Sequence, residues 1–305
     1  MLDDTQIPNP EPVASGPSDA DDSRRRLMRG VGVGLAGLAA GGLLASAKPA
    51  MAASVDVNIF NFALNFEYLG AEFYLRAVTG QGVSSYAGVT GVGTQGSVTG
   101  GGVVPFKTPA VAYFAQQLAN DELAHVRFVR AALGSMAIAE PSINLSSSWT
   151  ALAIAAGLIN STQTFNPFAD EVSFLLGAYI LEDVCVTALA GAASSLTNAN
   201  DIAYAAGLLG AEAYQAGAIR GYLSDIGAGV ATNAISALRA KLSGVGDNGT
   251  STQGNPFTIT NRDASAQAFR RTPAQVLNIA YGVAGTGHAS GGFFPNGVNG
   301  VITST

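Results

Sequence analysis

The sequence of 305 residues contains few of the residues on which common redox, zinc and nucleic-acid sites depend. It has one cysteine, Cys185, so no internal disulfide can form, and its two histidines, His125 and His288, are too few for a His-rich zinc site. Only 12% of residues are charged, and 15 Lys and Arg against 21 Asp and Glu give a net charge of −6. No basic run lies outside the N-terminal region, so we expect no nucleic-acid partner. Any metal site must rely mainly on carboxylates.

Residues 1–52 are predicted to be an export signal. The first 22 residues are polar and rich in Asp and Pro, a composition that does not fold by itself. The sequence SRRRLMR then precedes an uncharged run rich in Gly and Ala, and an Ala-x-Ala sequence ends at Ala52. The paired arginines resemble a twin-arginine signal. We expect cleavage after Ala52, export to the periplasm or the extracellular space, and no stable membrane insertion afterwards, with a retained transmembrane helix as the alternative.

Hydrophobic residues make up 48% of the chain, and many of them fall into long segments with helical spacing. Four long helices are predicted over residues 56–79, 108–134, 167–194 and 198–226. Shorter helices are expected over residues 231–242 and 272–281, while residues 149–160 could form a short helix or a loop. Residues 80–104 hold nine glycines, which indicates a loop or irregular strands.

These segments predict an all-α fold. Residues 53–245 would form a four-helix bundle with a glycine-rich insertion over residues 80–104. Residues 246–305, which include a short helix and a tail, would form a C-terminal extension that packs on the bundle.

Four glutamates fall singly in the apolar middles of the four long helices: they are Glu67, Glu122, Glu182 and Glu212. Four ionised carboxylates in one bundle layer would cost many kcal/mol, unless cations neutralise them or their pKa values rise. His125 follows Glu122 by three residues, so both side chains share one helix face. At the same spacing after Glu212 stands Gln215. Two divalent ions bridged by shared carboxylates would remove the cost of burying these charges.

This arrangement resembles the ferritin-like di-iron and di-manganese bundles, in which two helices each give a Glu and two others each give Glu-x-x-His. Longer stretches, LNFEYLGAEFYLRAVTG at 64–80, DELAHVRFVRAALG at 121–134 and LLGAEAYQAGAIRGYL at 208–223, are similar to ferritin-like proteins described as desiccation-related, from bacteria and plants. The resemblance covers about residues 55 to 300 and implies a ferritin-like fold. The metal ligands that it implies are Glu67, Glu122, His125, Glu182, Glu212 and Gln215.

Gln215 is the departure from the family pattern, because a neutral amide oxygen binds iron or manganese more weakly than an imidazole does. We therefore expect a dinuclear iron or manganese site in which one position is weakened or empty. His288 is interpreted as a loop residue, although it could fold over the bundle end and supply the missing imidazole. Cys185 is interpreted as a packing residue, although its thiolate could reach the metal.

Three other side chains receive structural interpretations. Glu72 and Glu140 are expected to be solvated carboxylates or a helix cap, away from the metal-binding face. Tyr74 follows Glu67 by seven residues, so it could approach the site as a hydrogen-bond donor or redox-active phenol, but core packing is the preferred reading.

Two classes of function follow from these patterns. The first is an exported metalloprotein that protects against stress by oxidising Fe(II) or consuming peroxide, with O₂ or peroxide at an open coordination position. The second is a metal-free structural or interaction protein that protects other macromolecules during drying, its glutamates protonated and paired. A ligand-binding role in the cell envelope is a third reading, and a homo-oligomer is left open.

Overall fold

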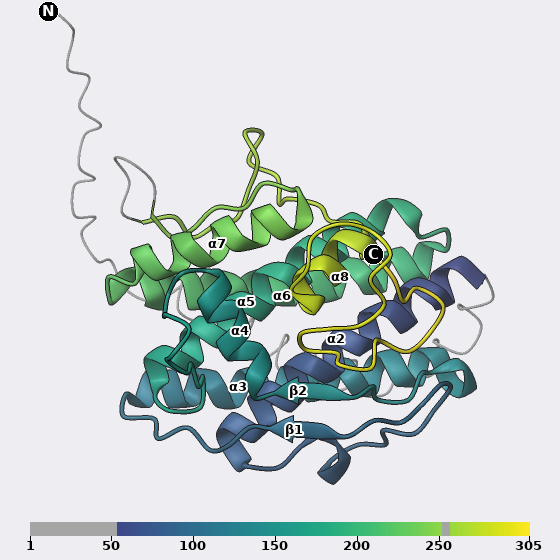
Figure 1. Cartoon of the computed structure of the whole chain (residues 1–305). Coiled ribbons are helices and arrows are strands. Elements are labelled where there is room, and N and C mark those ends of the chain that lie inside the picture. The colour runs from purple at the N-terminus through teal and green to yellow at the C-terminus, as the bar shows by residue number, and fades with distance from the viewer. Residues whose placement is uncertain (1–53, 252–256) are drawn as a thin grey trace, which may run out of the picture. The chain divides into compact units, whose positions relative to one another are not determined.

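The computed structural model describes residues 54–251 and 257–305, so the export signal predicted over residues 1–52 lies outside the described part of the chain. Four long helices are present (Figure 1), and their bounds are α2 (Ser54–Thr79), α3 (Pro109–Leu133), α5 (Glu171–Ala192) and α6 (Ala199–Asp225). Three shorter helices are α4 (Ser147–Ala155), α7 (Gly229–Ser243) and α8 (Pro273–Tyr281). The fold is mostly helical, which confirms the predicted all-α class.

Local residues explain where several helices begin or end. The α3 helix follows Thr108 at its N-cap, has Pro109 in its first turn and ends at Gly134, as the sequence predicts. In α8, the Thr272 side chain accepts from the backbone of Gln275, whose side chain accepts in return from the Thr272 backbone, which is a capping box.

The predicted start of the third long helix at residue 167 is wrong by four residues. The α5 helix begins at Glu171, because the Asp170 side chain accepts a hydrogen bond from the Ser173 backbone at 2.8 Å and caps the helix there. Upstream, the Asn166 side chain accepts from the Phe168 backbone at 3.0 Å and holds that segment in a turn. A proline therefore precedes the helix without opening it.

The four long helices pack as two pairs, α2 against α3 and α5 against α6, around one apolar core. Phe73 stacks on Phe174 at 5.4 Å between ring centroids, and Trp149 of α4 contacts Phe73 at 5.2 Å. Among the described residues, one helical stretch, 171–195, has the length and composition to cross a membrane. Since 72% of its most apolar window is buried inside the structure, it is explained as the core helix of the bundle.

The glycine-rich insertion lies along the α2 side of the bundle and carries a short strand (Figure 1). That strand, β1 (Val98–Gly100), pairs in parallel with β2 (Ile143–Leu145), so residues before and after α3 meet in a two-stranded sheet. Glu171, at the start of α5, accepts hydrogen bonds at 2.9 Å from the backbone N–H groups of Lys107 and Thr108, which ties the end of the insertion to α5.

The expectation that Glu72 and Glu140 are solvated is wrong, since both are buried, at 1% and 4% exposure. Glu72 accepts from Arg76 Nε at 2.5 Å and from the Val83 backbone N–H at 2.6 Å, which holds the start of the insertion against α2. Burial and the neighbouring Glu72 carboxylate raise the pKa of Glu140 to about 8, against the attraction of Arg76 and Arg130. Glu140 therefore keeps a proton at neutral pH.

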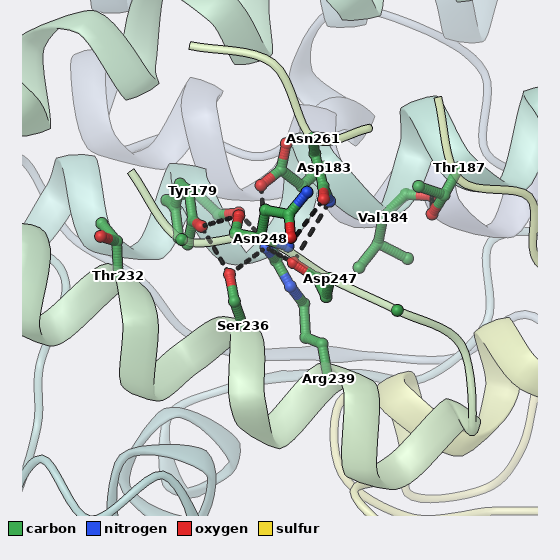
Figure 2. Close-up of polar contacts among 12 residues, drawn as sticks. Tyr179, Asp183, Val184, Thr187, Thr232, Ser236, Arg239, Asp247, Asn248 and Asn261 are labelled. Carbon is green, nitrogen blue, oxygen red and sulfur yellow. Dashed lines mark hydrogen bonds and ion pairs between the residues drawn. The ribbon is translucent and has the colours of Figure 1, made fainter. Parts of the chain in front are cut away.

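Buried ion pairs fasten the segment that follows α7 to the bundle (Figure 2). Arg239 of α7 contacts Asp183 of α5 and Asp247, each at 2.8 Å, while Arg220 of α6 contacts Asp183 and Arg271 contacts Asp247 at the same distance. Three guanidiniums thus face two carboxylates. The excess positive charge is dispersed over polar groups, since Arg220 also donates to the backbone carbonyls of residues 248, 249 and 258.

Candidate metal centre

The bundle turns the four predicted glutamates inward at the middle of its long helices. Glu67 lies on α2, Glu122 on α3, Glu182 on α5 and Glu212 on α6, and each is at most 5% exposed. Three of these carboxylates surround the single imidazole. The Nδ1 atom of His125 lies 3.4 Å from Glu67 Oε2, 3.6 Å from Glu122 Oε1 and 3.3 Å from Glu212 Oε1.

The ligand atoms of Glu67, Glu122, His125 and Glu212 all lie within 4.8 Å of one another. The separations from Nδ1 exceed the 2.7–2.9 Å of a charge-assisted hydrogen bond, so the groups converge on a common point at the distances of loose ion pairs. Several buried polar atoms around this point have no hydrogen-bond partner: they are Glu67 Oε2, His125 Nδ1, Glu182 Oε2, both carboxylate oxygens of Glu212 and Gln215 Oε1. A divalent cation among Glu67, Glu122, His125 and Glu212 would satisfy the unpaired atoms of these four residues.

The electrostatics agree with a site that favours cations. Burial raises the pKa of Glu122 to about 8 and that of Glu212 to about 7, and neighbouring carboxylates add to both shifts. Burial alone would lower the pKa of His125, but the adjacent carboxylates raise it above its ordinary value. Without a cation the cluster must therefore hold protons. Oxygen donors with one imidazole suit Fe(II) or Mn(II), so the donor set fits the predicted metals.

Glu182 lies beside this four-residue cluster and interacts with an aromatic hydroxyl. The Tyr74 hydroxyl of α2 donates a short hydrogen bond to Glu182 Oε1, and both side chains are buried. Burial, followed by the charge of the adjacent Glu212, raises the pKa of Glu182 well above its ordinary value. Packing was the preferred reading for Tyr74, and the structure shows that it also bonds to a predicted ligand.

Gln215 lies one helical turn after Glu212, as its spacing predicts, and is 5% exposed. Its Nε2 donates to Asp121 Oδ2 of α3 at 3.2 Å, while its Oε1 has no partner. An ionised carboxylate can accept hydrogen bonds but cannot donate them. The NH₂ end of the Gln215 amide is therefore the end that faces Asp121. The carbonyl oxygen is left free to act as a neutral ligand.

The other side chains considered as ligands lie outside the four-residue cluster. His288 is in the C-terminal tail, where its backbone N–H donates to Thr305 Oγ1 at 3.1 Å and its carbonyl accepts from the Thr305 N–H. Cys185 is a free, half-buried thiol whose pKa is raised by burial. Among the described residues, the group with metal-binding geometry includes neither of them.

Small, mostly apolar cavities adjoin the cluster between α2 and α5. One of about 20 Å³ is lined by Gly70, Glu122, Glu182 and Cys185 among apolar side chains, and another of about 30 Å³ reaches Glu67 and Cys185. Each is close to the volume of one water, but a buried water needs two to four polar partners. Apart from Glu67, Glu122 and Glu182, the residues that line the two cavities are apolar or Cys185.

Gly70 makes room for one of the predicted ligands. A Cβ atom at Gly70 would lie 3.1 Å from Glu122 Cδ and would overlap Glu122 Oε2. Sequence reasoning missed both Gly70 and Asp121. The signal for Gly70 was its position three residues after Glu67 on the same helix face, but nothing local indicated that α3 would approach it.

A four-helix bundle with inward carboxylates and a Glu-x-x-His sequence is the arrangement of ferritin-like proteins. Sequence comparison points to the same class. The ferritin-like domain model matches residues 55–225, from α2 through α6, and the chain belongs to this family. It is 29% identical over 267 residues to the ferritin-like catalase Nec2 of Nesocodon mauritianus, covering 81% of this chain and 84% of that protein.

A second relative is the desiccation-related protein PCC13-62 of Craterostigma plantagineum. It is 30% identical over 248 residues, covering 73% of this chain and 76% of that protein. No solved structure matches the chain significantly.

Proposed function

We propose that this protein is a metal-dependent oxidoreductase that consumes hydrogen peroxide. The observation that carries the proposal is the convergence of Glu67, Glu122, His125 and Glu212 within 4.8 Å, with buried donor atoms that lack hydrogen-bond partners. Support for peroxide as the substrate comes from the similarity to a relative named a ferritin-like catalase. When bound, iron or manganese supplies the electron-transfer steps that convert two H₂O₂ into two H₂O and O₂.

The chain's own groups would bind the ion and handle protons. Glu67, Glu122, His125 and Glu212 hold the first ion, and the negative carboxylates compensate its charge in the apolar core. Glu182, which is buried and accepts from the Tyr74 hydroxyl at Oε1, would accept and return protons beside the cluster. The cavities beside the site are lined mostly by apolar side chains.

A second ion would bind less tightly than the first. Its available donors are Glu182 Oε2, Glu212 and Gln215 Oε1, and no imidazole among the described residues joins them besides that of His125. Because an amide oxygen replaces an imidazole, we propose that the dinuclear site fills its second position only at high metal concentration. In this proposal the predicted export signal places the activity outside the cytoplasm.

Metal content and peroxide turnover, measured on the same samples, test the proposal. The protein is purified, loaded separately with Fe(II) and Mn(II), dialysed, and assayed for O₂ release from H₂O₂ and for Fe(II) oxidation. Glu212→Gln removes one ligand charge with little change in shape, and Asp225→Asn, at the exposed end of α6, makes the same charge change away from the site.

We expect the wild type and Asp225→Asn to bind metal and release O₂, and Glu212→Gln to lose both. Fewer than about one ion per ten chains in the wild type would contradict a metal site of the expected affinity and favour the metal-free protective role. Fe(II) oxidation without O₂ release would assign the protein to iron oxidation, which is the second candidate.

A further inference from the structure

The α3 and α6 helices, which carry Glu122, His125 and Glu212, face each other beside the metal cluster. These helices run antiparallel, and aromatic pairs close the interface on either side of the cluster: Phe114 contacts Tyr222 at 5.6 Å, and Phe128 contacts Tyr204 at 5.2 Å between ring centroids. Between the two aromatic pairs lies the Asp121–Gln215 hydrogen bond. Apart from the contact between His125 and Glu212, it is the one side-chain hydrogen bond that the described residues make between α3 and α6.

The Asp121–Gln215 pair differs from its surroundings in polarity and exposure. Asp121 is partly exposed, whereas Gln215 is 95% buried, so the pair extends from the surface towards the interior. Because Gln215 Nε2 is engaged by Asp121, the buried Oε1 has no partner and offers a second oxygen donor. The pair thus joins a partly exposed carboxylate to a buried amide.

Asp121 shares α3 with His125, the most accessible member of the cluster, and Gln215 shares α6 with Glu212. The His125 side chain is 12% exposed, against 6% for Glu67, 3% for Glu122 and 1% for Glu212. Asp121 precedes His125 by four residues, one turn or about 6 Å along the helix. The cavities that adjoin the cluster between α2 and α5 are mostly apolar, and a hydrated cation cannot cross such a layer at an acceptable energetic cost.

We propose that the Asp121–Gln215 pair is the passage by which a divalent cation enters the cluster, with Asp121 as a transient ligand and Gln215 Oε1 as the next donor. This inference rests on the proposed metal centre. Asp121 attracts the cation and replaces part of its hydration shell, and the Gln215 side chain then turns from Asp121 towards the ion. Asp121 is a positioning residue and is not a ligand of the ion in its final site.

Stopped-flow binding of Co²⁺ to the metal-free protein tests the passage, because Co²⁺ absorbs visible light when protein groups coordinate it. Asp121→Asn keeps the shape and a hydrogen-bond acceptor for Gln215 but removes the charge. Asp225→Asn, on α6 and exposed, is the matched control. Gln215→Leu replaces the buried amide between α3 and α6 with an apolar side chain. Circular dichroism checks that each variant is folded.

We expect Asp121→Asn to slow Co²⁺ association and dissociation by about tenfold each, so that Kd changes by less than about twofold, and to weaken the dependence of association on ionic strength. Gln215→Leu should slow association further, while Asp225→Asn should match the wild type. Unchanged association in Asp121→Asn would overturn the passage and leave the metal centre intact. Faster dissociation with unchanged association would make Asp121 a permanent ligand, which also overturns it. A wild type that binds no Co²⁺ would overturn both proposals.

Discussion

Substituting alanine at Gly70 tests whether Glu122 must occupy its observed position. The new Cβ would lie 3.1 Å from Glu122 Cδ, whereas carbon atoms in contact prefer about 3.5–4.0 Å. The Glu122 carboxylate must therefore move by about 0.4–0.9 Å. Since the obstructed atoms are the end of a flexible side chain, the fold should tolerate the change. Replacing a glycine inside a helix even contributes up to about 1 kcal/mol of stability.

Metal binding should respond in the opposite direction. A ligand displaced by close to 1 Å no longer meets the ion at bonding distance, and errors of this size cost up to about 100-fold at catalytic sites. We expect the affinity of Gly70→Ala for Fe(II) or Mn(II) to fall by about 10- to 100-fold, measured by competition with a chelator of known affinity. Thermal unfolding of the metal-free variant should occur at or above the wild-type temperature.

Gly210→Ala on α6 is the matched control, because its Cβ meets no atom within 4 Å. It should raise the stability of the metal-free protein by a similar amount and leave metal affinity unchanged. Equal metal affinity in Gly70→Ala and the wild type would refute the role given to Glu122. Unfolding of Gly70→Ala without metal would refute the claim that its effect is confined to the site.

Other perturbations separate the supporting interactions. Tyr74→Phe removes the hydroxyl that donates to Glu182 and should lower the free energy of unfolding of the metal-free protein by about 1–3 kcal/mol in urea titrations; no change would show that the hydrogen bond is unimportant. Asp247→Asn leaves three buried guanidiniums with one carboxylate and should lower the free energy of unfolding by about 3–5 kcal/mol. Arg271→Met leaves two guanidiniums with two carboxylates and should lower it less. The reverse order would contradict this charge balance. The pKa of Glu140 is raised from 4.5 to about 8 in the fold, so its contribution to stability is fully present below pH 4.5 and is lost as pH rises towards 8. Glu140→Gln should therefore flatten the fall in the free energy of unfolding over this pH range. An unchanged slope would contradict the raised pKa of Glu140.

The sequence predicted most helix boundaries because the signals that set them are local. The Thr108-Pro109 start of α3 and the capping box at Thr272 depend on residues within one turn of the helix end. The start of α5 was misplaced because Pro167 is compatible with both a first turn and a preceding loop. Only the competing hydrogen bond to Asp170 decides between them.

The candidate ligands could be proposed because charge is scarce in the long helices, so a lone glutamate in an apolar stretch is informative. The contacts around these ligands could not be predicted from the sequence, since they join residues far apart in the chain. Glu72 and Glu140 are separated by 68 positions, and their burial depends on how the insertion folds back on α2. Gln215 was predicted from spacing, but its partner Asp121 lies on another helix.

One metal ion is expected to bind among Glu67, Glu122, His125 and Glu212. Anomalous diffraction from crystals of the metal-loaded protein, recorded on both sides of the iron or manganese absorption edge, tests this position. We predict a peak at about 2.0–2.3 Å from His125 Nδ1 and from at least one oxygen of each of the three carboxylates. A metal-loaded crystal with no peak there, or with its strongest peak elsewhere, would contradict the expected position.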